Sequence, residues 1–220
     1  MPLPGRYQGD EYVRLVTGLD GPSAPVAAIP LLRPSLRPAL EEKLEKNGKV
    51  VALAPGGARN ILRDDALRRW PVENYALLAG KFLKEGYQVL LTGSHQDDWV
   101  RVPFEKLAVT DLVGQTSLTD LMALFGRCRL VVTHDSGPLH LAVASGTPTI
   151  ALFGPTNPGE KIPSSGKTKV LWGGEHLACR PCYDGRNYWD CHDNQCLKSL
   201  GVDRVFREAL ETIRRESEGG

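Results

Sequence analysis

Residues 134–140, with the sequence HDSGPLH, bring a carboxylate, a hydroxyl and two imidazoles together in one short stretch. Gly137 and Pro138 suit the last non-helical and the first helical position, because proline has no amide hydrogen to lose there and its φ is already helical. A helix start at Gly137 leaves backbone amides exposed beside Ser136, with His140 one turn further on. Exposed amides, a hydroxyl and an imidazole attract phosphate, so the stretch predicts an anion-binding turn.

The elements on either side of this turn would hold it in place. Residues 130–133 form an apolar, β-branched run that predicts a buried strand, and the apolar pattern resuming at Leu139 predicts a helix. A second strand is expected over 149–152, followed by a loop at 153–158. Because ligands of open parallel sheets bind at the carboxyl ends of the strands, both loops should face one site.

The ordered run HDSGPLH at 134–140, GTP at 146–148 and FGPT at 153–156 resembles the donor-binding signature of the family 9 glycosyltransferases, the ADP-heptose:lipopolysaccharide heptosyltransferases. The resemblance extends from about Val50 to the C-terminal helix. It implies the GT-B architecture, in which two Rossmann-like domains face each other. In such enzymes the C-terminal domain holds most of the nucleotide sugar, and the N-terminal domain supplies the acceptor site and a general-base aspartate. We therefore expect the C-terminal half of a GT-B enzyme, with no catalytic base in this chain.

The resemblance gives roles to three further loops. Arg68, which opens the sequence RRWP, takes the place of a lysine that contacts the donor phosphates; arginine keeps the charge but presents a planar fork. Asp97 matches a carboxylate near the donor ribose, and Thr116 lies where similar proteins meet the adenine, mainly through backbone contacts. Structural roles stay open for these residues: Arg68 as a solvated surface residue, Asp97 with Asp98 as a helix cap, and Ser117 as a cap beside Thr116.

Within the signature, the donor-binding candidates that the resemblance implies are Asp135, Ser136, Gly137 and His140. The alternatives are a structural loop carboxylate at Asp135 and a core histidine, satisfied by the sheet, at His140. The loop contains no DxD pair to hold a divalent cation between diphosphate and protein. A helix start and an arginine can replace such a cation, so no cofactor is expected to be required for transfer.

Four of the five cysteines fall close together, at Cys179, Cys182, Cys191 and Cys196. Four closely spaced thiols can hold one tetrahedral zinc ion, and His192 could replace one of them. Such a zinc would be structural, since four protein ligands leave no open position. Two disulfides and four reduced thiols are the alternatives, and a cytoplasmic location disfavours the disulfides.

The composition narrows the function classes. The chain has 220 residues, 41% of them hydrophobic and 24% charged, which is ordinary for a globular protein. Lys+Arg 27 against Asp+Glu 26 leaves a net charge of +1, so there is no global electrostatic case for nucleic acid or an anionic membrane. No apolar run reaches the length of a membrane span, and the first residues do not resemble a signal peptide. A cytoplasmic location is expected, peripheral to the inner membrane in the full enzyme.

The prolines of residues 1–48 suggest an inter-domain connection, ending in one helix at 38–46. Residues 49–220 are interpreted as one Rossmann-like nucleotide-sugar-binding domain. Further strands are expected at 50–54, 88–92 and 169–172, with a long loop at 55–71. Four further helices are expected: one that ends at Gly86, one that follows the polar loop 93–98, one from Ser117 to 125 and one over 202–216. Alternation of strands and helices implies a parallel sheet covered on both faces.

Together these observations predict the donor-binding domain of an inverting glycosyltransferase that uses an ADP-heptose-type nucleotide sugar in lipopolysaccharide core biosynthesis. The core acceptor would be bound by an N-terminal domain, and this chain alone is expected to bind the donor without transferring it, because no candidate base precedes Val50. Two alternatives would also bind a nucleotide: a GT-B type sugar-nucleotide epimerase, and a non-catalytic nucleotide-binding module.

Overall fold

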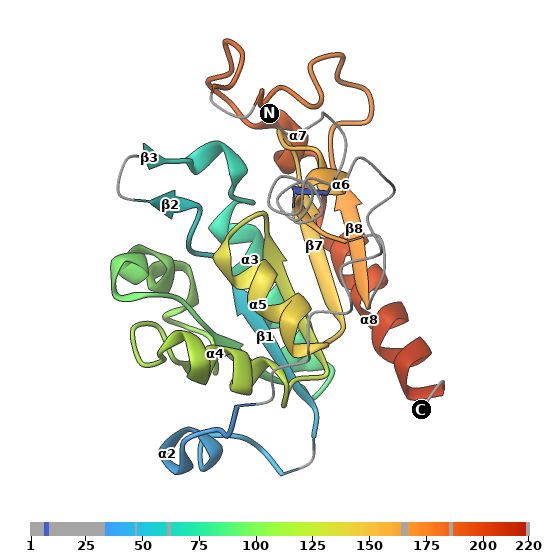
Figure 1. Ribbon diagram of the computed structural model, residues 1–220. Helices are drawn as coiled ribbons and strands as arrows, with labels where there is room; N and C mark the ends of the chain where they lie inside the picture. The colour runs from blue at the N-terminus through green and yellow to red at the C-terminus, as the bar shows by residue number, and fades with distance from the viewer. Residues whose placement is uncertain are drawn as a thin grey trace, which may run out of the picture.

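The computed structural model describes residues 7–8, 34–46, 48–60, 63–163, 167–184 and 187–218. Its centre is a six-stranded sheet with the strand order β5-β4-β1-β6-β7-β8 (Figure 1), and each neighbouring pair runs parallel. The strands are β1 (Val50–Ala54), β4 (Gln88–Leu91), β5 (Thr110–Asp111), β6 (Leu130–His134), β7 (Thr149–Phe153) and β8 (Thr168–Trp172). The α/β class and the open parallel sheet predicted from the sequence are confirmed.

The central strands are buried along their whole length. Every residue of β1, β6 and β7 is buried, as expected for strands covered on both faces. In β1, Val51 and Leu53 point into one hydrophobic cluster, while Val50 and Ala52 point into the other. This alternation follows from the two-residue repeat of a strand, and it fixes which helices pack on which face.

Two pairs of helices cover the sheet. α3 (Val72–Lys84) and α8 (Val202–Glu218) pack on one face, and α4 (Leu118–Phe125) and α5 (Gly137–Ser145) pack on the other (Figure 1). In α8 the buried residues are Val205, Ala209 and Ile213, spaced by four, which is the stripe of an amphipathic helix. The predicted helices ending near Gly86 and starting after Ser117 are confirmed, as is the C-terminal helix.

The order of the strands creates a crevice at the carboxyl end of the sheet. After β1 the chain builds β4 and β5 on one side, then returns to form β6 on the other side of β1. The loops that follow β1 and β6 therefore diverge, and open α/β sheets bind ligands at such a point. Figure 1 shows a hairpin at this end of the sheet, made of β2 (Arg59–Asn60) and β3 (Arg63–Asp64) and followed by the 3-10 helix η1 (Ala66–Arg68).

Several boundaries differ from the prediction. The helix expected over 38–46 is only α2 (Pro38–Glu41), because Gln88 bonds the backbone beyond it, accepting from the Glu45 amide at 2.8 Å and donating to the Lys43 carbonyl at 2.6 Å. The supposed long loop at 55–71 contains the hairpin and η1. The sequence also did not predict α6 (Pro158–Lys161) and α7 (Gln195–Lys198).

The weaker helix expected after residues 93–98 begins inside that loop instead. It is η2 (His95–Phe104), and Ser94 and Asp97 form its capping box. Most of the expected connection, residues 1–48, lies outside the described residues. In the described ranges, no helix is both long enough and apolar enough to cross a membrane.

Candidate functional site

The loop after β1 and the turn after β6 meet at the crevice. Gly57 has a φ of +78°, and a Cβ atom added there would lie 3.3 Å from Cβ of Ser136. A Cβ added at Gly56 would lie 2.4 Å from Cγ of Asp97. Glycine at these positions therefore allows a left-handed backbone and a close approach that a larger residue would obstruct.

The start of α5 faces open space. Ser136 is the N-cap residue, but its side chain makes no capping bond and instead donates to the His134 carbonyl at 3.3 Å. At Gly137, a Cβ atom added to the backbone would meet no described atom within 4 Å, apart from those of its chain neighbours and of its own helix backbone. Gly137 and Pro138 also line a cavity, so the start of α5 has room for a ligand, and the positive end of the helix dipole points to the same place.

Arg68 lies beside this helix start, held between two carboxylates. Its Nη1 is 3.1 Å from Oδ2 of Asp135, and its Nη2 is 3.5 Å from Oδ2 of Asp65. The Arg68 side chain is 19% exposed and that of Asp135 only 4%. The buried Nε atom of Arg68 has no hydrogen-bond partner among the residues that the structure describes. The two carboxylates therefore hold this guanidinium beside the helix start, and its hydrogen-bonding capacity is not fully used by the described residues.

His140 is exposed on α5, so the core-histidine alternative is wrong. Desolvation of the ring by its surroundings lowers its pKa, and this outweighs the opposing effect of the Asp135 carboxylate. The ring is accordingly neutral at pH 7, with one nitrogen able to donate a hydrogen bond.

Asp97 lines the crevice, but its carboxylate is occupied by protein groups. It accepts hydrogen bonds from the Gly57 amide at 2.9 Å, the Ser94 amide at 2.8 Å and the Ser94 hydroxyl at 2.6 Å. The capping role is therefore confirmed for Asp97, whereas Asp98 pairs with Arg101. A ribose contact by Asp97 stays a prediction.

An apolar cavity of about 420 Å³ adjoins the helix start. Thr116 lies in its wall, and Ser117 caps α4 with Asp120; an adenine contact by Thr116 stays a prediction. The apolar part of the lining comes mainly from Leu118, Leu121, Pro138 and Leu141. Leu118 is 73% exposed, so its side chain is accessible at this wall of the cavity. The sequence reading missed these leucines because it selected polar residues; the signal was an apolar residue at the first helical position after the Ser117 cap.

The sequence analysis also missed the pairing of two buried residues behind the site, Tyr75 and His134. Tyr75 of α3 and His134 of β6 are both fully buried. Burial is the largest cause that lowers the pKa of His134 to about 3, and the nearby Arg69 and Arg68 charges act in the same direction. His134 is therefore neutral, and it lies in the core immediately before the anion-binding turn.

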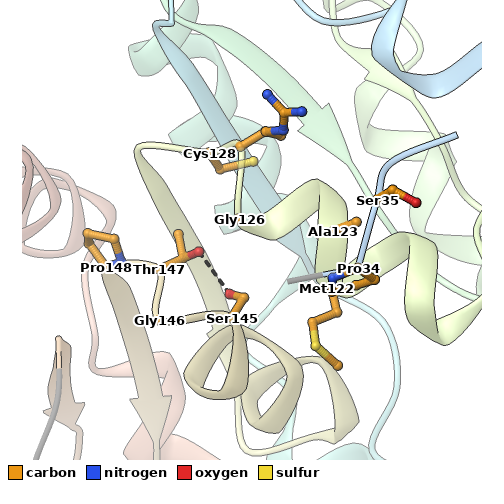
Figure 2. A pocket seen from close by; sticks show the side chains of 11 residues that line it. Pro34, Ser35, Met122, Ala123, Gly126, Cys128, Ser145, Gly146, Thr147 and Pro148 are labelled. Carbon is orange, nitrogen blue, oxygen red and sulfur yellow. Dashed lines mark hydrogen bonds between the residues drawn. The ribbon is translucent and has the colours of Figure 1, made fainter. Parts of the chain in front are cut away.

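A different cavity, of about 570 Å³, lies at the C-terminal ends of α4 and α5 (Figure 2). Figure 2 shows Ser145 and Thr147 facing each other there, with their hydroxyls 2.8 Å apart, opposite Met122 and Pro34. None of the predicted site residues lines it. Helix C-termini expose carbonyl oxygens, which repel anions, so this cavity does not suit a phosphate.

The cysteine-rich segment, residues 173–201 between β8 and α8, lies at the same end of the sheet as the crevice (Figure 1). All four of its cysteines are free thiols; Cys182 and Cys196 are buried and Cys179 is exposed. Burial raises the pKa of Cys182 to about 11, and the neighbouring Cys191, Cys179 and Cys196 add to the shift. Within the described ranges, however, no three His, Cys, Asp or Glu side chains are grouped closely enough to hold a metal ion.

Comparison with known proteins adds a family to this geometry. Residues 16–191 match the model of glycosyltransferase family 9 (heptosyltransferase). Lipooligosaccharide heptosyltransferase 2 of Haemophilus influenzae is 37% identical over 159 residues, which are 65% of this chain and 45% of the relative. Lipopolysaccharide heptosyltransferase 2 of Escherichia coli K12 is 33% identical over 159 residues, covering 64% of this chain and 44% of the relative.

Among solved structures, E. coli ADP-heptose lps heptosyltransferase II superimposes with a TM-score of 0.65 at 28% identity. The match covers 81% of this chain and 50% of that chain. The chain spans about half the length of the curated relatives it matches.

Proposed function

The chain belongs to glycosyltransferase family 9, the heptosyltransferases, and we propose that it forms the binding site for an ADP-heptose-type nucleotide-sugar donor. One observation carries the proposal: the open start of α5 adjoins both the Arg68 guanidinium and an apolar cavity. A nucleoside diphosphate has parts that match both features: its negative oxygens suit the helix start and Arg68, and its flat base suits the apolar cavity. The name of the structural relative, an ADP-heptose heptosyltransferase, supports adenine as that base.

In this proposal the diphosphate lies across the start of α5. The amide of Gly137 and the hydroxyl of Ser136 donate to its oxygens, and His140 donates from one turn further on. Arg68 turns from Asp135 toward the diphosphate, so that Asp135 is left to accept a hydrogen bond from the sugar. As the glycosidic bond breaks, negative charge grows on the diphosphate leaving group, and these fixed donors stabilise it without a divalent cation.

The adenine lies in the apolar cavity, against Leu118 and the backbone at Thr116. Asp97 is close to the ribose but also holds Gly57. A cavity of about 420 Å³ is within the usual range for small-ligand sites.

For the whole protein we propose transfer of the sugar, with inversion, to a lipopolysaccharide core acceptor at the cytoplasmic face of the inner membrane. The acceptor and the general base are assigned to an N-terminal domain, in keeping with residues 1–48 as the connection and 49–220 as the donor domain. The relatives are named heptosyltransferases, so neither the epimerase nor the non-catalytic module is favoured.

We also propose that Cys179, Cys182, Cys191 and Cys196 bind one structural zinc ion. The close spacing of the four cysteines in the sequence supports it, because four thiols can surround one tetrahedral zinc ion. Metal binding would require the segment to rearrange, because these side chains are not grouped for coordination in the part of the chain that the structure describes. Transfer itself requires no metal in this proposal.

Calorimetry with ADP, UDP and GDP tests the donor assignment. We expect ADP to bind, and UDP and GDP to bind more weakly, because the cavity adjoining the diphosphate is assigned to adenine. Arg68→Ala and His140→Ala should each weaken ADP binding by about 1–3 kcal/mol, the range for a hydrogen bond to a charged group. Equal binding of UDP would reject the adenine assignment, and unchanged affinity in both variants would reject the diphosphate site.

A further inference from the structure

Asn194, in the cysteine-rich segment, is bonded to the loop that carries Arg68. Its Nδ2 atom donates to the carbonyl oxygen of Arg69 at 2.8 Å and to that of Leu67 at 3.3 Å. These carbonyls stand on either side of Arg68 in the chain. An asparagine amide has two N–H donors, so a single side chain fixes the backbone on both sides of the guanidinium.

Asn194 is itself well anchored. Its own carbonyl accepts hydrogen bonds from the amides of Leu197 and Lys198, at 2.9 and 3.0 Å, at the start of α7. Leu197 is fully buried, and a Cβ added at Gly154 would lie 2.7 Å from its Cγ. The side chain of Asn194 therefore projects from a turn that the core holds in place.

The same segment is bonded at two other points near the crevice. Nε1 of Trp70 donates to the Leu200 carbonyl at 2.9 Å, just past the end of the Arg68 loop. The amides of Cys182 and Tyr183 donate to the Pro155 carbonyl, at 3.0 and 3.1 Å, in the loop after β7. The segment thus joins the loops that follow β1 and β7 from outside the crevice.

We propose that Asn194 is a positioning residue for the donor diphosphate, acting through Arg68. The inference rests on the proposed function, in which Arg68 contacts the diphosphate. Within the described ranges, the Arg68 side chain is also oriented by its ion pairs with Asp135 and Asp65. Without Asn194, the Leu67 and Arg69 carbonyls lose their partner, the loop gains alternative conformations, and the guanidinium faces the start of α5 for a smaller fraction of the time. Affinity falls by that fraction.

Asn194→Leu tests this with a side chain of similar shape that has no donor and no charge. Loss of the amide should weaken ADP binding about five- to tenfold, in keeping with one ordinary hydrogen-bonding group. Asn187→Leu is the matched control, because Asn187 is an exposed asparagine of the same segment. The control should bind ADP with wild-type affinity.

A double-variant cycle separates positioning from a general structural role. If Asn194 acts through Arg68, Asn194→Leu should have no further effect on ADP affinity in the Arg68→Ala background. Hydrogen exchange of the Arg68 and Arg69 amides, measured without ligand, should also be faster in Asn194→Leu than in the wild type.

The contrary outcomes are distinct. A full effect of Asn194→Leu in the Arg68→Ala background, or unchanged exchange in the loop, would overturn the positioning role. Wild-type affinity in Asn194→Leu together with weak binding in Arg68→Ala would overturn it alone and leave the donor site standing. If Arg68→Ala also binds normally, or if the wild type binds no ADP, the proposed function fails and the inference fails with it.

Discussion

The hydroxyl of Tyr75 lies 3.1 Å from Nδ1 of His134, and both side chains are fully buried. This contact joins the helix α3 to the last residue of β6, immediately before the anion-binding turn. The two rings also meet edge to face, with their centroids 6.1 Å apart. The Nε2 atom of His134 has no hydrogen-bond partner within the described part of the chain. Protonation of the ring would therefore place a positive charge in the core, away from water.

We expect the stability of the protein to fall on mild acidification because of His134. Burial lowers its pKa from the ordinary 6.5 to about 3, so between these values the unfolded state binds a proton that the native state excludes. The stability contribution is therefore complete above pH 6.5 and is lost progressively as the pH falls toward 3. The loss at pH 5 should be about 2 kcal/mol, measurable by urea unfolding at pH 7.5 and pH 5.

His134→Asn removes the titrating group while keeping a side chain that can bond Tyr75. Its unfolding free energy should depend less on pH over this range, with a residual slope from His140, whose pKa is lowered as well. His192→Asn is the control, since this exposed histidine forms its ion pair at the surface, with Asp190 at 2.8 Å. An undiminished slope in His134→Asn would contradict the assignment.

Gly56→Ala should destabilise the protein and weaken ADP binding together. The new methyl would lie within 2.4–2.8 Å of the Asp97 side chain, which must move and release the Gly57 amide. Overpacking of this kind costs about 1–3 kcal/mol. Gly201→Ala is the control, because no atom in the described ranges lies within 4 Å of its added Cβ. Unfolding and ADP titration of both variants check the prediction; equal stabilities would contradict it.

Much of the fold followed from the sequence, because burial on both faces makes strands such as β1 and β6 continuous apolar runs. The capping box at Ser117 and the turn at Gly137 were recognisable for local reasons, since backbone geometry selects those residues. The roles of Asn194, Tyr75 and similar residues could not be predicted this way. Each role depends on a partner far along the chain, and the local sequence does not show which distant residues come into contact.

The short elements were missed for a related reason. α7 is stabilised by packing of Cys196 and Leu197 against Gly154 and Gly174, not by its own four residues. Similarly, the sequence allowed two roles for Asp97, a ribose contact and a helix cap. The hydrogen bonds from Gly57 and Ser94 to its carboxylate establish the cap. Tertiary contacts override weak local preferences in such segments.

Leu118→Asp should weaken binding of ADP but not of pyrophosphate. Leu118 is 73% exposed in the wall of the apolar cavity, so a carboxylate there removes the apolar surface proposed for adenine and leaves the core intact. Leu77→Asp offers a matched control, since Leu77 is also exposed, at 62%, on the helix α3. Competition of ADP and pyrophosphate for each variant checks the result. Equal losses for the two ligands would mean that charge, and not base contact, causes the effect.

The last prediction concerns the four clustered cysteines and their proposed zinc ion. Elemental analysis of the purified chain should find about one equivalent of zinc. Bound metal would hold Cys179, Cys182, Cys191 and Cys196 as thiolates, and this would overcome the raised pKa of Cys182. Chelation should then loosen the segment, and hydrogen exchange should rise between residues 179 and 196. Because Asn194 lies in this segment and bonds the Arg68 loop, chelation should also weaken ADP binding. Cys128→Ser is the control, since Cys128 is buried next to α4 and belongs to a different cluster. Metal-free protein with all of its thiols titratable would reject zinc in favour of reduced cysteines, and the loss of four titratable thiols without metal would indicate two disulfides.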